Sequence, residues 1–280
     1  MPAAPPRPIE IGGRRFEWGT RTYVMGIVNV TPDSLSGDGV LDAARAADQA
    51  ARMVAEGADL IDVGSESTRP GHAPLSVADE WARLEAPLRA IRAAVDTPIT
   101  VDTSKAGVAE RAFDAGADAL NDVRGLLGDA DLAPLLARHG LPAVVMHNQR
   151  DRAFGGDVIA DIRAGLRESI EVAERAGVVA GQLIVDPGFG FGWEPAQNLE
   201  MVRRLGELRD LGRPLLVGVS RKSTLGLVLD KPEDERAWGT AAAVALSVQA
   251  GADIVRVHDV AEMVDVVKVA DAISRPGAAP

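Results

Sequence analysis

The chain has 280 residues, enough for one large α/β domain with an ample core, and its 46% hydrophobic and 25% charged residues are ordinary for a globular protein. Thirty basic and 41 acidic residues give a net charge of −11, which argues against a protein that coats nucleic acid. There is no cysteine, so disulfides, thiolate zinc sites and a thiol nucleophile are excluded, and we expect a cytoplasmic location.

Residues 1–22 are predicted to form a tail and a small hairpin. The first ten residues, MPAAPPRPIE, lack the apolar core of a signal peptide. No stretch reaches the roughly 18 apolar residues of a membrane span, so no membrane partner is expected. Residues 8–11 and 15–18 alternate in polarity around Gly12 and Gly13, which is typical of a β-hairpin.

Eight short apolar runs follow within residues 23–274, each ending in polar residues and separated from the next by a helix-like segment. The expected strands are 23–30, 60–64, 99–102, 119–123, 143–147, 183–186, 215–220 and 254–258. The expected helices are 41–56, 77–94, 106–115, 132–139, 158–176, 196–211, 235–250 and 261–273. Four helices end at a glycine, in AEGAD, DAGAD, ERAGV and VQAGAD, as a left-handed C-cap favours.

This repeated unit predicts a parallel sheet, because right-handed crossovers keep successive strands parallel. Eight such units can close into a TIM (β/α)8 barrel, and the short N-terminal β-hairpin would then plug its amino-terminal end. A doubly wound open sheet is the structural alternative. No linker-like stretch divides residues 23–274 into two domains, and residues 275–280 are expected to form a C-terminal tail.

The ends of the seventh and eighth predicted strands carry basic residues. The segment GVSRKS, from Gly218 to Ser223, opens a helix, so its backbone N–H groups and Lys222 can meet an anion. Arg256 and His258 are two residues apart on a strand and share a face, in a part of the barrel rim where phosphate commonly binds. We expect an anion site here. The alternatives are a solvated turn and an arginine paired with a core carboxylate.

Asp102, Asn121 and Asp186 each end an apolar strand. A buried carboxylate must be paired or hydrogen-bonded, and this trio suits the amidine edge of a guanine-like or pterin-like ring. Helix N-capping is the alternative, above all for Asp102, which precedes Thr103 and Ser104.

Three rim loops are rich in turn-forming residues. Asn29 leads into TPDS, which contains Asp33 and Ser34, and TRPG spans residues 68–71. Long loops on this rim are commonly lids. The segment GFGFG at 188–192 lacks the spacing of a dinucleotide fingerprint, and we expect its glycines to let a ligand approach the backbone closely.

Eight motifs, taken in order, closely resemble the dihydropteroate synthase family over roughly residues 23–273: MGIVNVTPDS, GSESTRPG, VDTSKAGVAERA, AGADALNDV, VVMH, DPGFGFG, GVSRKS and RVHDV. The resemblance implies a transferase of folate biosynthesis with the TIM-barrel fold. In that reaction 4-aminobenzoate displaces diphosphate from 6-hydroxymethyl-7,8-dihydropterin diphosphate, giving 7,8-dihydropteroate, and Mg2+ assists. Family members are commonly homodimers. Departure of diphosphate is largely dissociative in the family, so catalysis is positional and electrostatic and requires no covalent nucleophile.

The resemblance also implies a role for each residue that matches a motif. Pterin binding falls to Asp102, Asn121, Asp186 and Lys222, with Met146 packed on the ring. Diphosphate binding falls to Asn29, Arg69, Arg256 and His258, and Asn29 also contacts magnesium. Thr68, Pro70, Phe191, Gly218 and Ser223 border the 4-aminobenzoate pocket, and Asp33 and Ser34 lie on the loop that closes over the site.

Three positions depart from the family pattern. Leu35 stands where phenylalanine is usual, beside 4-aminobenzoate and the sulfonamides that mimic it, so we expect reduced sulfonamide sensitivity. Trp193 replaces a usual lysine and is expected to shield its loop or to stack on a ligand. Ser65 replaces a usual glycine, with no expected effect.

Two functional alternatives stay open. One is a catalytically silent pterin-binding paralogue, for which the altered first loop and Trp193 leave room. The other is a methyltetrahydrofolate-corrinoid methyltransferase, which needs no diphosphate site and is disfavoured by the basic residues of the last two strands. His147 ends the fifth strand and is either a rim residue or a structural hydrogen-bonding group.

Overall fold

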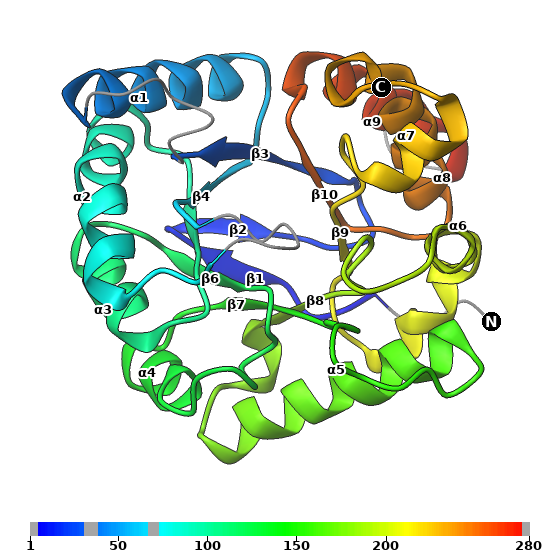
Figure 1. Ribbon diagram of the computed structural model, residues 1–280, viewed down its shortest axis with the longest axis horizontal. Coiled ribbons are helices and arrows are strands. Elements are labelled where there is room, and N and C mark those ends of the chain that lie inside the picture. The colour runs from blue at the N-terminus through cyan, green and yellow to red at the C-terminus, as the bar shows by residue number, and fades with distance from the viewer. Residues whose placement is uncertain (1–4, 31–38, 67–72, 276–280) are drawn as a thin grey trace.

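The computed structural model describes residues 5–30, 39–66 and 73–275, which form a barrel of strands surrounded by helices (Figure 1). The barrel strands are β3 Tyr23–Asn29, β4 Leu60–Gly64, β5 Ile99–Asp102, β6 Ala119–Asp122, β7 Ala143–Met146, β8 Leu183–Asp186, β9 Leu216–Val217 and β10 Ile254–Val257. The helices are α1 Gly39–Ala55, α2 Val77–Ala94, α3 Ala106–Asp114, α4 Leu132–His139, α5 Val158–Arg175, α6 Pro195–Arg204, α7 Ser223–Leu229, α8 Ala237–Gln249 and α9 Val260–Ser274.

The strands lie in the order β8-β7-β6-β5-β4-β3-β10-β9, and all of these pairings are parallel. A parallel bridge between Val185 and Leu215 joins the two ends of the sheet. Beside it, the N–H of Val185 donates to the carbonyl of Pro214 at 2.9 Å. The sheet therefore closes, so the predicted (β/α)8 barrel is confirmed and the open-sheet alternative is wrong.

Glycines end four of the helices as predicted. Gly57, Gly116, Gly177 and Gly251 have φ values of 107°, 104°, 94° and 100°, a region that residues with a Cβ rarely adopt. Each glycine turns the chain from a helix toward the next strand, namely β4, β6, β8 and β10. The glycine that recurs in the sequence thus lies where each of these four helices ends and the chain turns toward the next strand.

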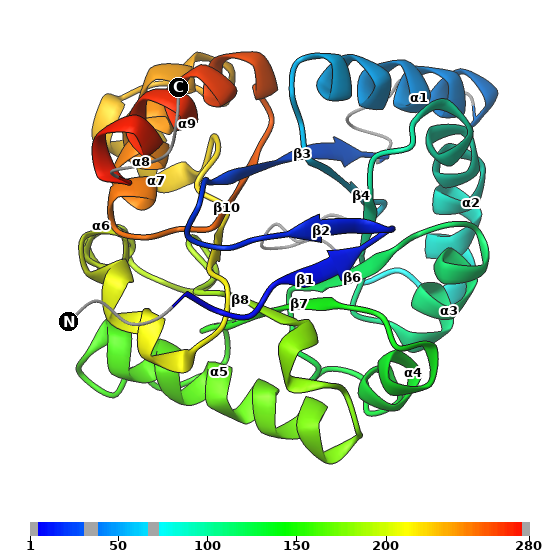
Figure 2. The ribbon, with the colours of Figure 1, turned by 180° about the vertical axis from the view of Figure 1, so that it is seen from behind.

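The N-terminal hairpin, β1 Ile9–Ile11 and β2 Arg14–Phe16, packs across one end of the barrel (Figure 2). Its buried Ile9, Ile11 and Phe16, with Trp18 beyond β2, form one apolar cluster with inward side chains near the strand starts. These partners are Tyr23, Met25, Leu60, Ala119, Val144, Ile184, Leu216 and Ile254. The amino-terminal end of the barrel is therefore filled by side chains, and the opposite end carries the polar residues.

Some element bounds differ from those predicted. Four strands end one residue early, which leaves Val30, Val123, His147 and His258 just beyond β3, β6, β7 and β10. The seventh strand shrinks to the two residues of β9. The helix expected at 196–211 divides into α6 and a 3-10 stretch, Leu205–Leu211. The α7 helix stands apart from α8, because Asp230 takes a φ of 53° and Pro232 follows.

In the described part of the chain, no helix has the length and apolar character needed to span a membrane.

Candidate active site

The inward side chains are apolar at the amino-terminal ends of the strands, where the hairpin packs, and become polar toward the carboxyl-terminal ends. In the strand register, Asp102 of β5 lies beside Asn121 of β6, and Met146 of β7 lies beside Asp186 of β8. Because alternate strand residues share a face, the sequence position of each residue decides that it points into the barrel. Four of the five residues predicted to hold a pterin therefore line one arc of the interior.

Arg256 of β10 crosses the interior and joins two carboxylates on other strands. Its Nε lies 2.6 Å from Oδ2 of Asp62, and its Nη2 lies 2.9 Å from Oδ2 of Asp102. The alternative that the sequence left open for Arg256, pairing with a core carboxylate, is thus observed. Asp102 does not cap α3, whose N-cap residue is Lys105, so the capping alternative is wrong.

Asp62 of β4 is the functional candidate that the sequence reasoning missed. Its carboxylate is fully buried and accepts hydrogen bonds from the Thr100 hydroxyl and, at 3.0 Å, from Nδ2 of Asn121. An aspartate at an inward position of the apolar run LIDVG was the available clue, because burying a carboxylate is costly unless it is paired. Asp62 thus connects Arg256 to Asn121.

Several ionisable groups of this site have strongly shifted pKa values. Burial and, next to it, the charge of Asp62 raise the pKa of Asp102 to about 7 against the opposing effect of Arg256. Burial raises the pKa of Asp186 to about 6, although the Gly188 N–H, 2.8 Å away, favours the charged form. Burial and, next to it, the charge of Arg256 lower the pKa of Lys222 to about 8. Such shifts in one place are typical of a functional site.

The described residues of the predicted anion site lie at and just beyond the ends of β9 and β10. Lys222 is the N-cap residue of α7, and its Nζ lies 4.2 Å from the centroid of the Phe191 ring. Ser220 Oγ lies 3.0 Å from Nδ1 of His258 and also accepts from its backbone N–H. Burial lowers the pKa of His258 to about 4, with Arg256 as the next cause, so this imidazole is neutral at neutral pH. Arg221 turns away to pair with Asp259.

His147 has a structural role in the loop after β7. Its side chain is buried, with Nε2 2.9 Å from Oε1 of Gln149 and its ring 5.6 Å from that of Trp193. Trp193 is itself buried and also contacts Phe154. Of the two roles expected for Trp193, the structure therefore favours shielding of its loop.

The glycines of GFGFG make room for neighbouring protein segments. A Cβ on Gly188 would lie 1.9 Å from the carbonyl oxygen of His147, and one on Gly192 would lie 2.5 Å from the backbone nitrogen of Arg150. A Cβ on Gly190 would press on the Lys222 side chain at 3.1 Å. These glycines therefore let the rim loops pack on one another, and the expectation that they let a ligand approach the backbone closely stays a prediction.

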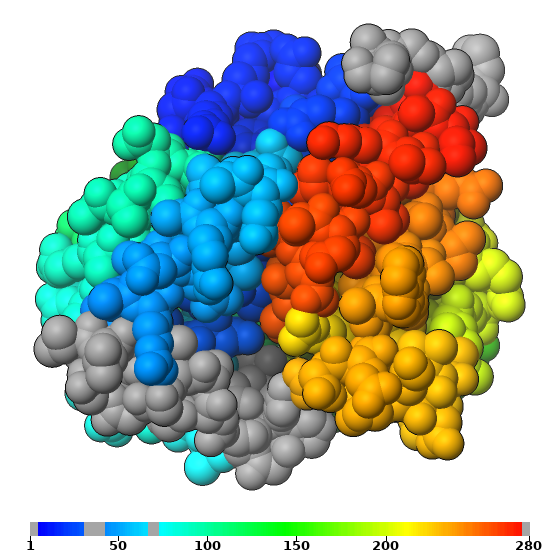
Figure 3. All heavy atoms as spheres, turned by 90° about the horizontal axis from the view of Figure 1, so that it is seen from above, coloured from blue at the N-terminus to red at the C-terminus, as the bar shows by residue number. Residues whose placement is uncertain are grey.

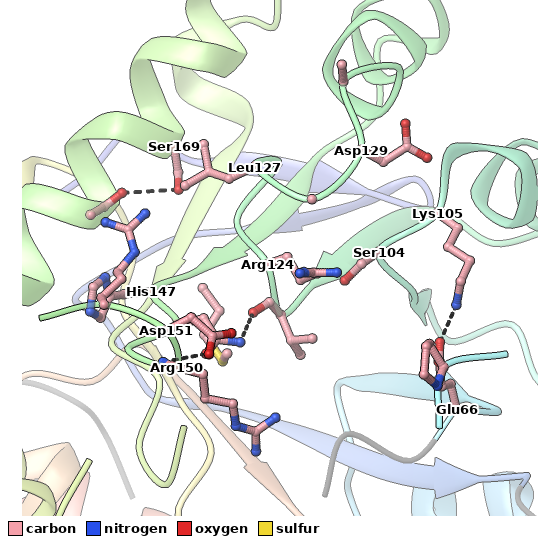
Figure 4. A pocket seen from close by; sticks show the side chains of 18 residues that line it. Glu66, Ser104, Lys105, Arg124, Leu127, Asp129, His147, Arg150, Asp151 and Ser169 are labelled. Carbon is pink, nitrogen blue, oxygen red and sulfur yellow. Dashed lines mark hydrogen bonds and ion pairs between the residues drawn. The ribbon is translucent and has the colours of Figure 1, made fainter. Parts of the chain in front are cut away.

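A cleft of about 860 Å³ adjoins the polar interior between the loops that follow β5, β6 and β7 and the face of α5 (Figure 4). Of the predicted site residues that the structure describes, Met146 alone lines it. Lys105 on its wall pairs with Glu66 and, at 2.5 Å, with the buried Glu80. The cleft is thus a neighbour of the polar interior and does not contain its carboxylates.

The remaining predicted residues fall into two groups. Asn29 ends β3 and is exposed, Gly218 follows β9, and Ser223 opens α7. Asp33, Ser34, Leu35, Thr68, Arg69 and Pro70 lie outside the described residues.

Comparison with known proteins agrees with this geometry. A family model described as pterin binding enzyme matches residues 25–258. The dihydropteroate synthase of Synechocystis sp. is 43% identical over 278 residues, covering 96% of each chain, and that of Bacillus subtilis is 43% identical over 258 residues, covering 92% of this chain and 90% of its own.

Among solved structures, Xanthomonas albilineans dihydropteroate synthase with 4-aminobenzoic acid superposes with a TM-score of 0.91 at 38% identity, covering 98% of this chain and all of the other. The relatives match nearly the whole barrel, and the motif residues described above fall inside the matched range. The chain therefore belongs to the pterin binding enzyme family and, within it, to the dihydropteroate synthases.

Proposed function

We infer that the chain is a dihydropteroate synthase that condenses 4-aminobenzoate with 6-hydroxymethyl-7,8-dihydropterin diphosphate in folate biosynthesis, releasing diphosphate. The observation that carries the proposal is the in-register arc of Asp102, Asn121 and Asp186 inside the barrel, with Lys222 at its rim. This arrangement offers acceptors for a pterin beside a cation for its charged substituent. The comparisons give no support to the silent paralogue or the corrinoid methyltransferase, and membership of the family makes the chain a sulfonamide target.

Within this function we assign the pterin ring to the barrel interior. The carboxylates of Asp102 and Asp186 accept N–H groups of the ring, Asn121 supplies a further polar contact, and Met146 packs on the ring face. Burial keeps these contacts in a low-dielectric setting, where a correctly placed hydrogen bond is stronger and a missing one is costly. The ring is thus fixed in orientation, with its methylene carbon toward the rim.

We assign the departing diphosphate to Lys222, Arg256 and His258, together with Asn29 and Arg69. Arg256 contacts its carboxylates through Nε and Nη2, so we propose that Nη1 faces the diphosphate. Neutral His258 serves as a hydrogen-bond donor there, and Lys222 supplies positive charge. Cations placed in advance where negative charge develops lower the barrier without any rearrangement of the protein.

We propose that Mg2+ binds at this site together with the diphosphate group of the substrate. Among the described residues no group of three or more histidine, aspartate or glutamate side chains could hold a metal ion. Mg2+ is often bound by few protein oxygens together with substrate phosphates, and Asn29 offers one amide oxygen. The chemistry supplied there is neutralisation of charge on the diphosphate. We propose that Mg2+ binding, followed by calorimetry, is weak alone and tightens when the pterin diphosphate is present.

The function is tested by diphosphate release that depends on added 4-aminobenzoate. We expect Lys222→Ala and Arg256→Ala each to lower kcat/KM at least about tenfold, equivalent to roughly 1.4 kcal/mol of lost transition-state stabilisation. Lys231→Ala, an exposed lysine between α7 and α8, is the matched control and should behave as the unmodified protein. Pterin binding without release would favour the silent paralogue, and unchanged turnover in both variants would refute the anion site.

We also propose a homodimer through α7, α8 and α9, which lie together on one face of the molecule (Figure 3). Large apolar side chains are exposed on these helices: Leu227, Trp238, Leu246, Val269 and Ile273. Exposed apolar patches of this kind mark association surfaces. Trp238→Asp should shift the protein to monomer in sedimentation, whereas Val179→Asp, at an exposed apolar position elsewhere, should not. The cytoplasmic location stays a prediction, to be tested by cell fractionation.

A further inference from the structure

The carboxylate of Asp62 is enclosed by hydrogen-bond donors of the protein itself. Asp62 shares the inward face of β4 with Leu60 and is fully buried. Its Oδ1 accepts from the Thr100 hydroxyl. Its Oδ2 accepts from Nε of Arg256 at 2.6 Å and from Nδ2 of Asn121 at 3.0 Å. Because three donors already occupy this buried carboxylate, Asp62 acts on a ligand only through the residues that it holds.

The contact with Asp62 fixes which way round the Asn121 amide lies. A carboxylate in an ion pair only accepts hydrogen bonds, whereas an amide carries an acceptor oxygen and a donor nitrogen. A reversed amide would place Oδ1 of Asn121 against Oδ2 of Asp62, and two buried acceptors that face one another are costly. One N–H of Nδ2 is therefore held by Asp62. The amide oxygen and the second N–H are left for a ligand in the barrel.

The same carboxylate also fixes the guanidinium of Arg256. Nε of Arg256 donates to Asp62, and Nη2 donates to Oδ2 of Asp102 at 2.9 Å. Two contacts to a planar guanidinium define its plane as well as its position. In the sheet, β3 stands between β10, which carries Arg256, and β4, which carries Asp62. Asp62 is thus the one acceptor shared by a side chain of β10 and a side chain of β6.

An amide of fixed orientation distinguishes between two kinds of bicyclic ring. An oxygen beside an N–H matches an amino group beside a ring nitrogen, which is the order of groups on the 2-amino edge of a pterin. A lumazine carries a carbonyl oxygen in place of that amino group and an N–H in place of that ring nitrogen, which is the reverse order. We propose that Asp62 is a positioning residue that holds the Asn121 amide and so makes the site select the 2-amino ring over its 2-oxo analogue.

This proposal rests on the proposed function and is tested by calorimetric binding of 6-hydroxymethylpterin and 6-hydroxymethyllumazine. The unmodified protein should bind the pterin at least about tenfold more tightly, because the lumazine sets donor against donor and acceptor against acceptor. Asp62→Asn keeps the shape of the side chain and lets the Asn121 amide turn round. We expect it to lower the ratio of the two affinities at least about fivefold, through weaker binding of the pterin. The KM for 4-aminobenzoate should change less than about twofold.

Asp253→Asn is the matched control, because Asp253 is likewise fully buried and pairs with an arginine, Arg209, but lies beside Leu215 at the start of β9. It should leave the ratio unchanged. Thr100→Val keeps the charge of Asp62 and removes one of its donors, so it should lower the ratio about twofold and serves as the test if Asp62→Asn does not fold.

An equal loss of affinity for both rings would show that Asp62 is only structural and would overturn the proposal. An unmodified protein that binds both rings equally well would overturn it too. If the unmodified protein bound the pterin but released no diphosphate, the proposed function would fail, and the ratio of the two affinities would still decide the role of Asp62.

Discussion

Asp186, Asp102 and Lys222 are side chains whose surroundings bring their titration close to neutral pH. In the proposed function, Asp186 and Asp102 are ionised when they accept the N–H groups of a pterin, and Lys222 is protonated when it attracts diphosphate. Their pKa values of about 6, about 7 and about 8 leave a narrow interval in which all three are charged. The charge state of the site is therefore set by burial more than by residue type.

We expect a bell-shaped dependence of kcat/KM for the pterin diphosphate on pH. The acid limb should fall between about pH 7 and 6, as Asp102 and Asp186 take up protons. The alkaline limb should fall through about pH 8, as Lys222 loses its proton. Steady-state kinetics across this range tests the prediction. Lys222→Arg keeps its charge at every pH tested, so an alkaline limb that persists unchanged in this variant would contradict the assignment.

At the residue scale the sequence showed which polar residues lie at or near the strand ends, and the structure brings Asp102, Asn121 and Asp186 together as expected. It did not show that Asp62 connects them, because one aspartate inside an apolar run has no visible partner until β4 and β10 are placed.

The β1–β2 hairpin is the element whose contribution is most easily separated from the chemistry. Phe16 packs at 4.8 Å between ring centroids on Tyr23 and at 5.9 Å on Trp18, at the end of the barrel remote from Lys222. The alternating pattern of residues 8–18 predicted this hairpin. The division of the helix expected at 196–211 was not predictable, because the apolar spacing continues while the hydrogen bonding changes to the 3-10 type.

We expect Phe16→Ala to lower the free energy of unfolding by about 3–5 kcal/mol, the usual cost of removing a buried aromatic side chain. Well below the melting temperature, kcat/KM should stay within about twofold, because the polar site lies at the other end of the strands. Denaturant titration and steady-state kinetics measure the two quantities. Arg14→Ala, on the exposed side of β2, should change stability by less than about 0.5 kcal/mol. A loss of activity without a loss of stability would show that the hairpin serves the site directly.

For the whole molecule, the join between β8 and β9 is where the barrel has the least backbone pairing. The Asp253 carboxylate supports this join: Oδ2 accepts from the Leu215 N–H at 2.9 Å and pairs with Nη1 of Arg209 at 3.0 Å. Burial raises the pKa of Asp253, and Arg209 opposes that rise. Leu215, which forms the bridge to Val185 of β8, is thus held in place by a partly buried ion pair.

We expect Arg209→Met to cost about 3–5 kcal/mol of unfolding free energy at pH 8, where it leaves a buried charge without a partner. Because the folded-state pKa of Asp253 is raised, protonation should relieve this penalty as the pH falls, so the loss should be smaller at pH 5. Hydrogen exchange should become faster at residues 215–217. Adding Asp253→Asn should restore stability at pH 8. An equal loss at both pH values would mean that Arg209 acts through packing alone.

Because the hairpin packs across the amino-terminal end of the barrel, we expect ligands to enter from the opposite end, where the described polar residues lie. Under the proposed function two ring systems share that route, so the ring that binds deeper has to enter before the ring that binds above it. We therefore expect the pterin, bound inside the barrel, to bind before the aromatic amine at the rim. Their joined product then leaves as one body, along the path by which its two halves came in.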